Sequence, residues 1–131
     1  MSTKEVATPE GLAKPAGVWS TVVVSQPGKL VCVAGLLATD ANRNIVGPGD
    51  ITVQTRQVCE NLKAALASVG AQLSDVIRVD VYIANMDHFD AIHAVRRQYF
   101  TKDPPASTMV EVSRFTKPEA LIEITALAVI S

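Results

Sequence analysis

The chain has 131 residues, of which 48% are hydrophobic and 19% charged, and its formal net charge is -1. A chain of this length supports one domain that buries roughly two-thirds of its unfolded surface. Acidic and basic residues are interspersed, so no basic stripe suited to nucleic acid is present and we expect no nucleic-acid partner. No run approaches the ~18 apolar residues of a membrane span and residues 1–5 form no apolar leader, so we expect a cytoplasmic protein that does not bind membranes.

The cysteines and histidines argue against a metal centre. Cys32 and Cys59 are the only cysteines, and isolated thiols in a predicted strand and a predicted helix are typical of reduced packing residues. His88 and His93 are separated by five positions, about 140° around a helix, which does not put two ligands on one face. We expect neither a metal nor a cofactor.

The N-terminal part predicts a strand pair. Residues 1–14 are polar or small and are expected to be a flexible segment, with a single domain over 15–131. The β-branched density of residues 18–24 predicts a strand, residues 26–28 (Gln-Pro-Gly) a tight turn, and residues 30–37 the return strand of a hairpin.

Residues 51–69 predict the first helix. Asp50 suits the N-cap, and Gly70 suits the position just beyond the C-terminal end. Apolar residues recur at offsets 0, 4, 7, 8 and 11, which is one helical face: Val58, Leu62, Ala65, Leu66 and Val69. We expect that face to pack on a sheet.

The second half predicts a strand, a helix and two further strands. Residues 76–83 alternate as a half-buried strand does, with apolar side chains on one side: Ile77, Val79, Val81 and Ile83. A helix over about 86–100 is stopped by Pro104 and Pro105. One side of this helix carries Phe89, Ile92, Arg96 and Phe100, with His93 at its edge. Residues 107–112 and 121–130 are the last two strands.

The element order is therefore β-β-α-β-α-β-β, an α+β arrangement with one mixed sheet covered by two helices. Residues 22–24 and 126–130 are apolar on both sides. The second face of the sheet should consequently meet protein rather than water.

Several separated segments resemble the Rid (reactive-intermediate deaminase, YjgF-type) family in order and spacing. Residues 33–37 resemble the family's Val-Ser-Gly-Gln-Ile strand end, and residues 50–64 resemble its first helix. Residues 105–112 resemble the substrate-binding strand, and residues 122–129 the last strand. The resemblance implies a chorismate-mutase-like fold assembled as a homotrimer, with small-molecule ligands bound in clefts at the subunit interfaces.

Ser107 is where the chain departs from this family, whose arginine at that place clamps the substrate carboxylate. Thr108 and Met109 follow it, and the backbone groups of Met109 can still hold a planar ligand. A cation from elsewhere is the alternative, although surface cations are usually solvated: the candidates are Arg96, Arg97, Arg114 and Lys117.

Glu123 is the strongest catalytic candidate. Its side chain should face away from those of Ile122 and Ile124 on the same strand. The resemblance implies that this glutamate orients or activates the hydrolytic water, as a carboxylate of suitable pKa can do. An outward-facing strand glutamate without a chemical role fits the same pattern.

Four other residues occupy family site positions. Trp19 replaces a tyrosine and could stack on a planar substrate, or pack in the core or an interface. Ala34 replaces a serine, and Gly35 allows close backbone approach. His93 replaces an asparagine and would suit an acid or a hydrogen-bond donor, although a lone histidine on a helix edge is more often structural.

Two functions are compatible with these residues. The first is a cofactor-free hydrolase, an imine or enamine deaminase in which Glu123 activates water while Gly35, Met109 and Trp19 hold the substrate. Because Ser107 cannot pair with a carboxylate, weak or no activity on 2-iminopropionate-type substrates is expected, and larger conjugated ones are favoured, as in the Rid-like 2-aminomuconate deaminases. The alternative is a non-catalytic trimeric module that binds a metabolite or assists a pathway.

Overall fold

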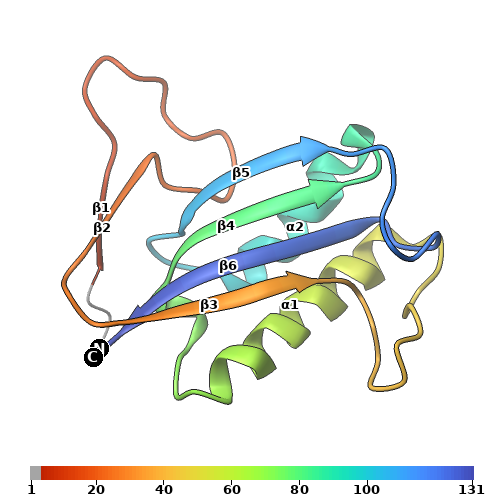
Figure 1. The fold of residues 1–131 in the computed structure, drawn as a ribbon. Helices are drawn as coiled ribbons and strands as arrows, with labels where there is room; N and C mark the ends of the chain where they lie inside the picture. The colour runs from red at the N-terminus through yellow and green to blue at the C-terminus, as the bar shows by residue number, and fades with distance from the viewer. Residues whose placement is uncertain (1–3) are drawn as a thin grey trace.

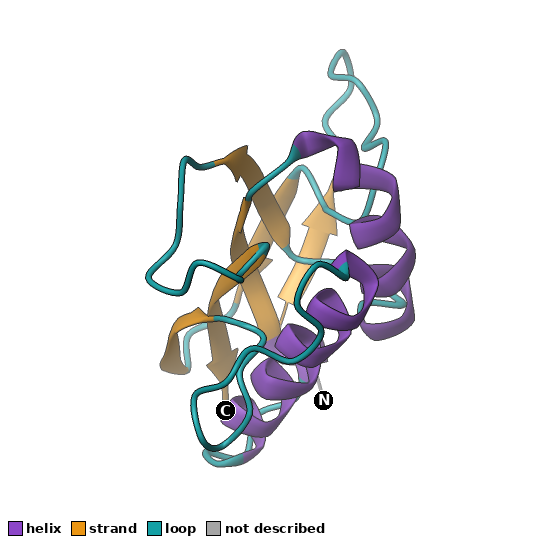
Figure 2. Ribbon diagram, turned by 90° about the vertical axis from the view of Figure 1, so that its right-hand side faces the viewer, coloured by secondary structure: helices purple, strands orange, loops and turns teal. Residues whose placement is uncertain are grey.

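The computed structural model describes residues 4–131, which form an α+β fold with two helices on one face of a mixed sheet (Figures 1 and 2). The main sheet has four strands, in the spatial order β3 (Lys29–Leu36), β6 (Ile122–Ile130), β4 (Val76–Ile83) and β5 (Ala106–Glu111). Strands β4 and β5 are parallel and the other neighbours are antiparallel. The helices are α1 (Ile51–Ala67) and α2 (Phe89–Tyr99), with short 3-10 turns η1 (Leu73–Asp75) and η2 (Met86–His88).

The predicted hairpin of residues 18–24 and 30–37 is wrong. Strand β2 (Val22–Ser25) pairs instead with β1 (Lys4–Ala7) in a separate two-stranded sheet, while β3 pairs with β6. Gly28 lies against β6, since a Cβ there would be 2.9 Å from Cγ1 of Val129. The turn therefore carries the chain from one sheet to the other, and β1 is a strand within the segment where no element was expected.

Helix α1 confirms its predicted start. The Asp50 carboxylate accepts a hydrogen bond from the Val53 N–H at 3.0 Å, which satisfies one of the free donors of the first turn. The helix buries Val58, Leu62 and Leu66 as predicted. Val69 is 51% exposed, so its assignment to the buried face is wrong, because the helix ends at Ala67 before reaching it.

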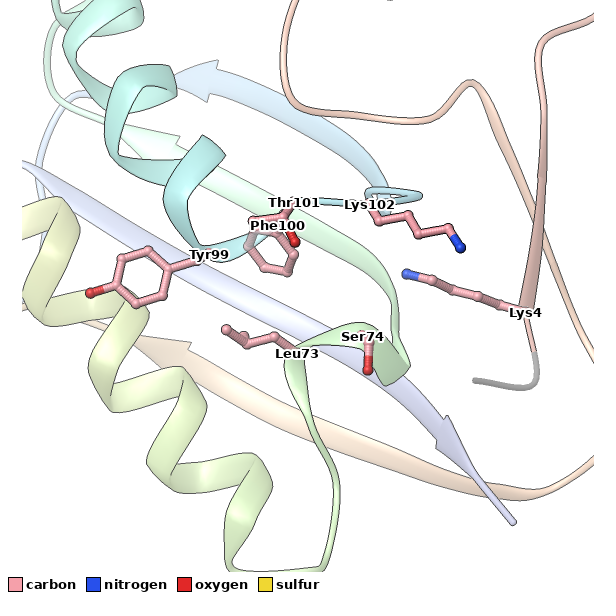
Figure 3. A pocket seen from close by; sticks show the side chains of 7 residues that line it. All are labelled: Lys4, Leu73, Ser74, Tyr99, Phe100, Thr101 and Lys102. Carbon is pink, nitrogen blue, oxygen red and sulfur yellow. The ribbon is translucent and has the colours of Figure 1, made fainter. Parts of the chain in front are cut away.

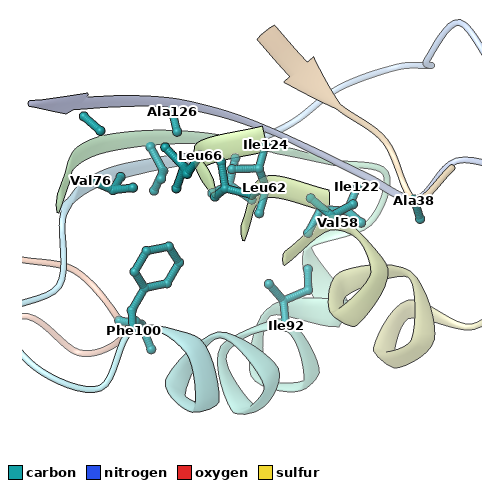
Figure 4. Close-up of a cluster of buried hydrophobic side chains, with 14 of the residues drawn as sticks. Ala38, Val58, Leu62, Leu66, Val76, Ile92, Phe100, Ile122, Ile124 and Ala126 are labelled. Atoms are coloured by element: carbon teal, nitrogen blue, oxygen red, sulfur yellow. The ribbon is translucent and has the colours of Figure 1, made fainter. Parts of the chain in front are cut away.

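The core lies between the sheet and the two helices (Figure 4). Its fully buried residues from the strands include Val81, Ile83, Ile122 and Ile124. The pairing of β4 with β6 shifts between Val76 and Arg78, so Val76 faces the core and Ile77, which alternation placed there, is only half-buried. The strict alternation predicted for this strand is therefore wrong at its start.

The other face of the main sheet carries no helix (Figure 2). Tyr82 and Glu123 are half-buried on this open face, and Leu30 is 62% exposed. Cys32 is also exposed here, so only Cys59 fits the expected packing role. Burial raises the pKa of Cys59 to about 12, which makes that thiol inert at neutral pH.

Candidate functional site

A cavity of about 210 Å³ lies between helix α2 and strand β5. Six side chains from three parts of the chain line it: Trp19, Phe89, His93, Arg96, Ser107 and Met109. Four of the eight residues expected at a site therefore meet in one cavity. Phe89 and Arg96 join them, and neither was proposed as a site residue beyond the mention of Arg96 as a possible cation.

Aromatic rings form one wall of this cavity. The ring centroids of Phe89 and His93 are 4.0 Å apart and stacked, and Trp19 meets His93 edge-on at 5.9 Å. The tryptophan is positioned by its neighbour Ser20, whose N–H donates to the Pro105 carbonyl at 3.0 Å at the start of β5. The Gly17 backbone packs against the Trp19 and His93 rings. A Cβ at this position would overlap the Trp19 ring and lie 2.6 Å from Nε2 of His93.

His93 presents a hydrogen-bond acceptor to its surroundings. Its Nδ1 lies 2.9 Å from the Phe89 carbonyl oxygen, and since a carbonyl can only accept, Nδ1 carries the hydrogen. Burial lowers the pKa of the ring, so it is neutral at physiological pH and Nε2 keeps its lone pair. Nε2 is buried without a partner among residues 4–131. The sequence placed His93 at the helix edge with a pKa near neutrality, whereas the structure buries the residue, with 1% exposed, and lowers that pKa.

Arg96 is buried at the floor of the cavity, with 1% of the residue exposed. Its Nη2 donates to the Val18 carbonyl at 3.1 Å and to Ser107 Oγ at 3.2 Å, while Nε is buried without a partner among the described residues. The sequence offered Arg96 as one of four cations that could replace the anchor, against the general expectation that such cations are solvated. The predicted helix side that Arg96 shares with Ile92 and Phe100 is indeed the buried one.

Glu123 lies on the opposite face of the sheet from this cavity. Its neighbours Ile122 and Ile124 point into the core, so its carboxylate points to the open face. Gly35 lies beside it, since a Cβ on Gly35 would be 2.9 Å from Cδ of Glu123. Ala34 and Thr108 are exposed. The expected site residues thus form two groups within one chain: those that line the cavity behind the sheet, and Glu123 with Gly35 on the open face.

Gln54 anchors the start of strand β6, a role that sequence reasoning missed. Its Nε2 donates to the carbonyls of Gly47 at 3.2 Å and Glu119 at 2.9 Å, and its Oε1 accepts from the Leu121 N–H at 2.8 Å. A fully buried glutamine that satisfies three backbone groups fixes the loop two residues before Glu123.

A second, smaller cavity of about 80 Å³ lies where β1, η1 and the end of α2 meet (Figure 3). Lys4 and Lys102 reach toward each other across it. The Lys4 ammonium donates to the Val76 carbonyl at 2.7 Å, and burial lowers its pKa. None of the expected site residues lines this cavity.

Residues 4–131 contain no group of three or more His, Cys, Asp or Glu side chains placed to hold a metal ion. Within the same range, every helix is too short or too polar to cross a membrane.

Comparison with known proteins places the chain in a family. Residues 11–130 match the family described as Endoribonuclease L-PSP. The crystal structure of YyfB from Yersinia pestis, described as a protein of unknown function of the conserved Rid family, superposes with a TM-score of 0.90. It is 34% identical, over 98% of this chain and 99% of the other. The chain belongs to the Rid family.

Relatives of this Rid protein include proteins with the RutC name. A RutC family protein of Pyrococcus horikoshii is 42% identical over 95% of this chain and 97% of its own length. A protein of Acinetobacter baylyi named 3-aminoacrylate deaminase RutC is 35% identical over the same shares of the two chains.

Proposed function

We propose that this Rid protein is a cofactor-free hydrolase that releases ammonia from a reactive or conjugated imine or enamine, in clefts between the subunits of a homotrimer. The observation that carries the proposal is the division of the site residues between two faces of one sheet. Glu123 beside Gly35 supplies a carboxylate on one face, and the ring-walled cavity supplies a binding pocket behind the other. The name of the Acinetobacter baylyi relative supports the deaminase reaction.

The reaction needs a base and a held substrate rather than a cofactor. Water adds to the C=N carbon while its proton passes to the Glu123 carboxylate, and the nitrogen takes up a proton, giving a carbinolamine. The Glu123 carboxyl then returns its proton to the amino nitrogen, the C–N bond breaks, ammonia leaves with its electron pair, and the hydroxyl proton is lost to solvent to give the carbonyl product. An enamine reaches the same path after protonation at carbon gives the imine.

Assembly is part of the proposal, because Glu123 and the cavity can face one ligand only if they belong to different protomers. The open sheet face, with half-buried Glu123 and exposed Leu30, is available to a second chain. Light scattering should give about three times the chain mass of 13.9 kDa. A monomer in solution would leave the two halves of the site apart and contradict the proposal.

The alternative is a trimeric module that binds a metabolite without turnover. Ser107 favours it, because the residue that anchors substrate in the family is absent from that position. The two readings differ in whether the Glu123 carboxylate moves a proton.

Substitution Glu123→Gln separates the two functions. The amide keeps the shape of the side chain but not its basicity, so ammonia release from 3-aminoacrylate or 2-iminopropionate should fall at least ~100-fold while ligand affinity changes little. Glu119→Gln, at an exposed carboxylate four residues earlier, is the matched control and should keep wild-type turnover. If neither the wild type nor a variant releases ammonia from any imine tested, the binding module is the better reading.

A further inference from the structure

Arg96 is a buried cation without a counter-ion. Among residues 4–131 the only ion pair joins Arg78 and Asp80, at 2.9 Å, and it does not involve this guanidinium. Burial lowers the pKa of Arg96 to about 10, which still leaves it charged at neutral pH. The Phe100 ring, with its centroid 6.0 Å from Cζ, offers only a weak cation–π contact. Buried charges are normally paired with an opposite charge. Because residues 4–131 supply no such partner for the Arg96 guanidinium, an anion from outside the chain would complete the site.

The position of the guanidinium suggests what that partner is. Nη2 reaches the Ser107 hydroxyl, so the positive charge of helix α2 sits beside the strand position at which the family carries its arginine. Ser107 is small enough to leave that space free. Nε remains buried and unpaired beside the cavity that Arg96 lines.

His93 adds the complementary group one turn earlier on the same helix. Its unpaired Nε2 can accept from an N–H or O–H of a ligand, whereas Arg96 can only donate. Trp19 and Phe89 supply flat walls. The cavity, about 210 Å³, has room for a small acid. A 2-imino acid carries both matching groups: its imine N–H can donate to His93 Nε2, and its carboxylate can accept from Arg96.

We infer that Arg96 binds the substrate carboxylate in place of the arginine missing at position 107, and that the substrates are small planar imino or enamino acids. The reaction assigned to them rests on the function proposed above, whereas the anion site rests on Arg96 alone. The expectation of weak activity on 2-iminopropionate-type substrates followed from the absence of an anchor at Ser107. With the anchor on α2, we expect such substrates to be accepted.

Pyruvate and its neutral amide, pyruvamide, test the anion site directly. Pyruvate is the product of 2-iminopropionate hydrolysis, and the amide has nearly the same shape without the charge. In calorimetric titrations the wild-type protein should bind pyruvate roughly ten- to a hundredfold more tightly than pyruvamide, as a charge-assisted contact gives. Equal affinities for the two would overturn the inference without any variant.

Arg96→Met should remove this preference by weakening pyruvate binding at least ~10-fold while pyruvamide affinity stays within about twofold. Arg97→Met, at the exposed neighbouring arginine, is the matched control and should bind both probes as the wild type does. Equal loss of both probes in Arg96→Met would indicate that the arginine only shapes the cavity. Arg96→Lys keeps the charge and provides a second variant if the methionine variant does not fold.

A charge relocation gives the sharpest outcome. Ser107→Arg alone should not improve pyruvate binding, because the new guanidinium would lie against that of Arg96. In the double variant Arg96→Met, Ser107→Arg the anchor returns to strand β5, and at least part of the preference for pyruvate should return. A double variant that binds no better than Arg96→Met would contradict the exchange of positions.

Ammonia release separates failure of this inference from failure of the proposed function. Pyruvate binding that depends on Arg96, with no ammonia released from 2-iminopropionate, would keep the anion site and remove the hydrolase. Turnover that depends on Glu123 but is unchanged in Arg96→Met would keep the hydrolase and remove the anion site.

Discussion

The Nη2 atom of Arg96 lies 3.2 Å from the hydroxyl oxygen of Ser107, and this contact brings a charge from helix α2 to the strand position where the sequence resemblance implies a family arginine. The guanidinium is also bonded to the Val18 carbonyl at 3.1 Å, so it joins three segments of the chain at the floor of the cavity. The chain thus lacks an arginine at position 107 but carries one at position 96, whose guanidinium lies beside the same point of the fold.

Gly17→Ala should disturb the aromatic wall. The added Cβ would be 2.6 Å from Nε2 of His93 and would also overlap the Trp19 ring, so both rings must move. Overpacking of this kind costs about 1–3 kcal/mol. Trp19 is the only tryptophan, so its fluorescence spectrum should change together with a loss of ligand binding. The exposed neighbour substitution Ala16→Ser should leave the spectrum as it is, and an unchanged spectrum in Gly17→Ala would contradict the packing described.

His93 should make stability depend on pH in a defined direction. Burial holds its pKa in the folded state below the ordinary histidine value of 6.5, so the unfolded chain binds the proton more tightly. The free energy of unfolding should therefore fall as pH drops through about 6.5, by up to about 1.4 kcal/mol per pH unit, until the folded-state pKa is reached.

Urea denaturation at about pH 7.5 and about pH 5.5 measures this loss. In His93→Gln the free energy of unfolding should decrease less between these two pH values than in the wild type. In His88→Gln, at the only other histidine, the decrease should be as large as in the wild type. The same decrease in the wild type and in His93→Gln would show that the ring is not held neutral by burial.

Gly35→Ala should move the Glu123 carboxylate. The new Cβ would lie 2.9 Å from Cδ and 3.0 Å from Oε2, so the end of the glutamate must rotate away. Because that end is only half-buried, stability should change by less than about 1 kcal/mol, whereas kcat/KM for an imine should fall at least ~10-fold. Ala67→Ser, at an exposed residue of helix α1 behind the other face of the sheet, should leave kcat/KM unchanged. Full activity in Gly35→Ala would exclude a role for the present position of the carboxylate.

Gln54→Leu should destabilise the fold. It would leave the Leu121 N–H and the carbonyls of Gly47 and Glu119 without their partner in a buried place. Each such group costs about 1–3 kcal/mol, so a loss of about 3 kcal/mol or more is expected from urea denaturation. Gln98→Leu, at an exposed glutamine on α2, should change stability by less than about 0.5 kcal/mol. A loss in Gln54→Leu no larger than in this control would show that the network contributes little.

The sequence by itself determined both helices, four of the strands to within a few residues, and the family. Local signals suffice for these: the carboxylate at Asp50 caps a helix wherever it precedes one, and apolar spacing puts Val58 and Leu62 on one face. The sequence also singled out Trp19, His93, Ser107 and Met109, which meet in one cavity.

Only the tertiary structure decided the pairing of β2 with β1, the neutral tautomer of His93 and the burial of Arg96. Strand pairing depends on which strand edges are free in the folded chain. The turn at residues 26–28 predicts pairing of β3 with the strand before it, whereas β3 pairs with β6, almost a hundred residues later. The environment of Arg96 depends on partners distant in sequence, here the Val18 carbonyl 78 positions away, and the His93 ring meets Trp19 from an equally remote segment. The helix pattern shows which side Arg96 occupies but not which strand lies beside it, so the cation next to Ser107 became visible only in three dimensions.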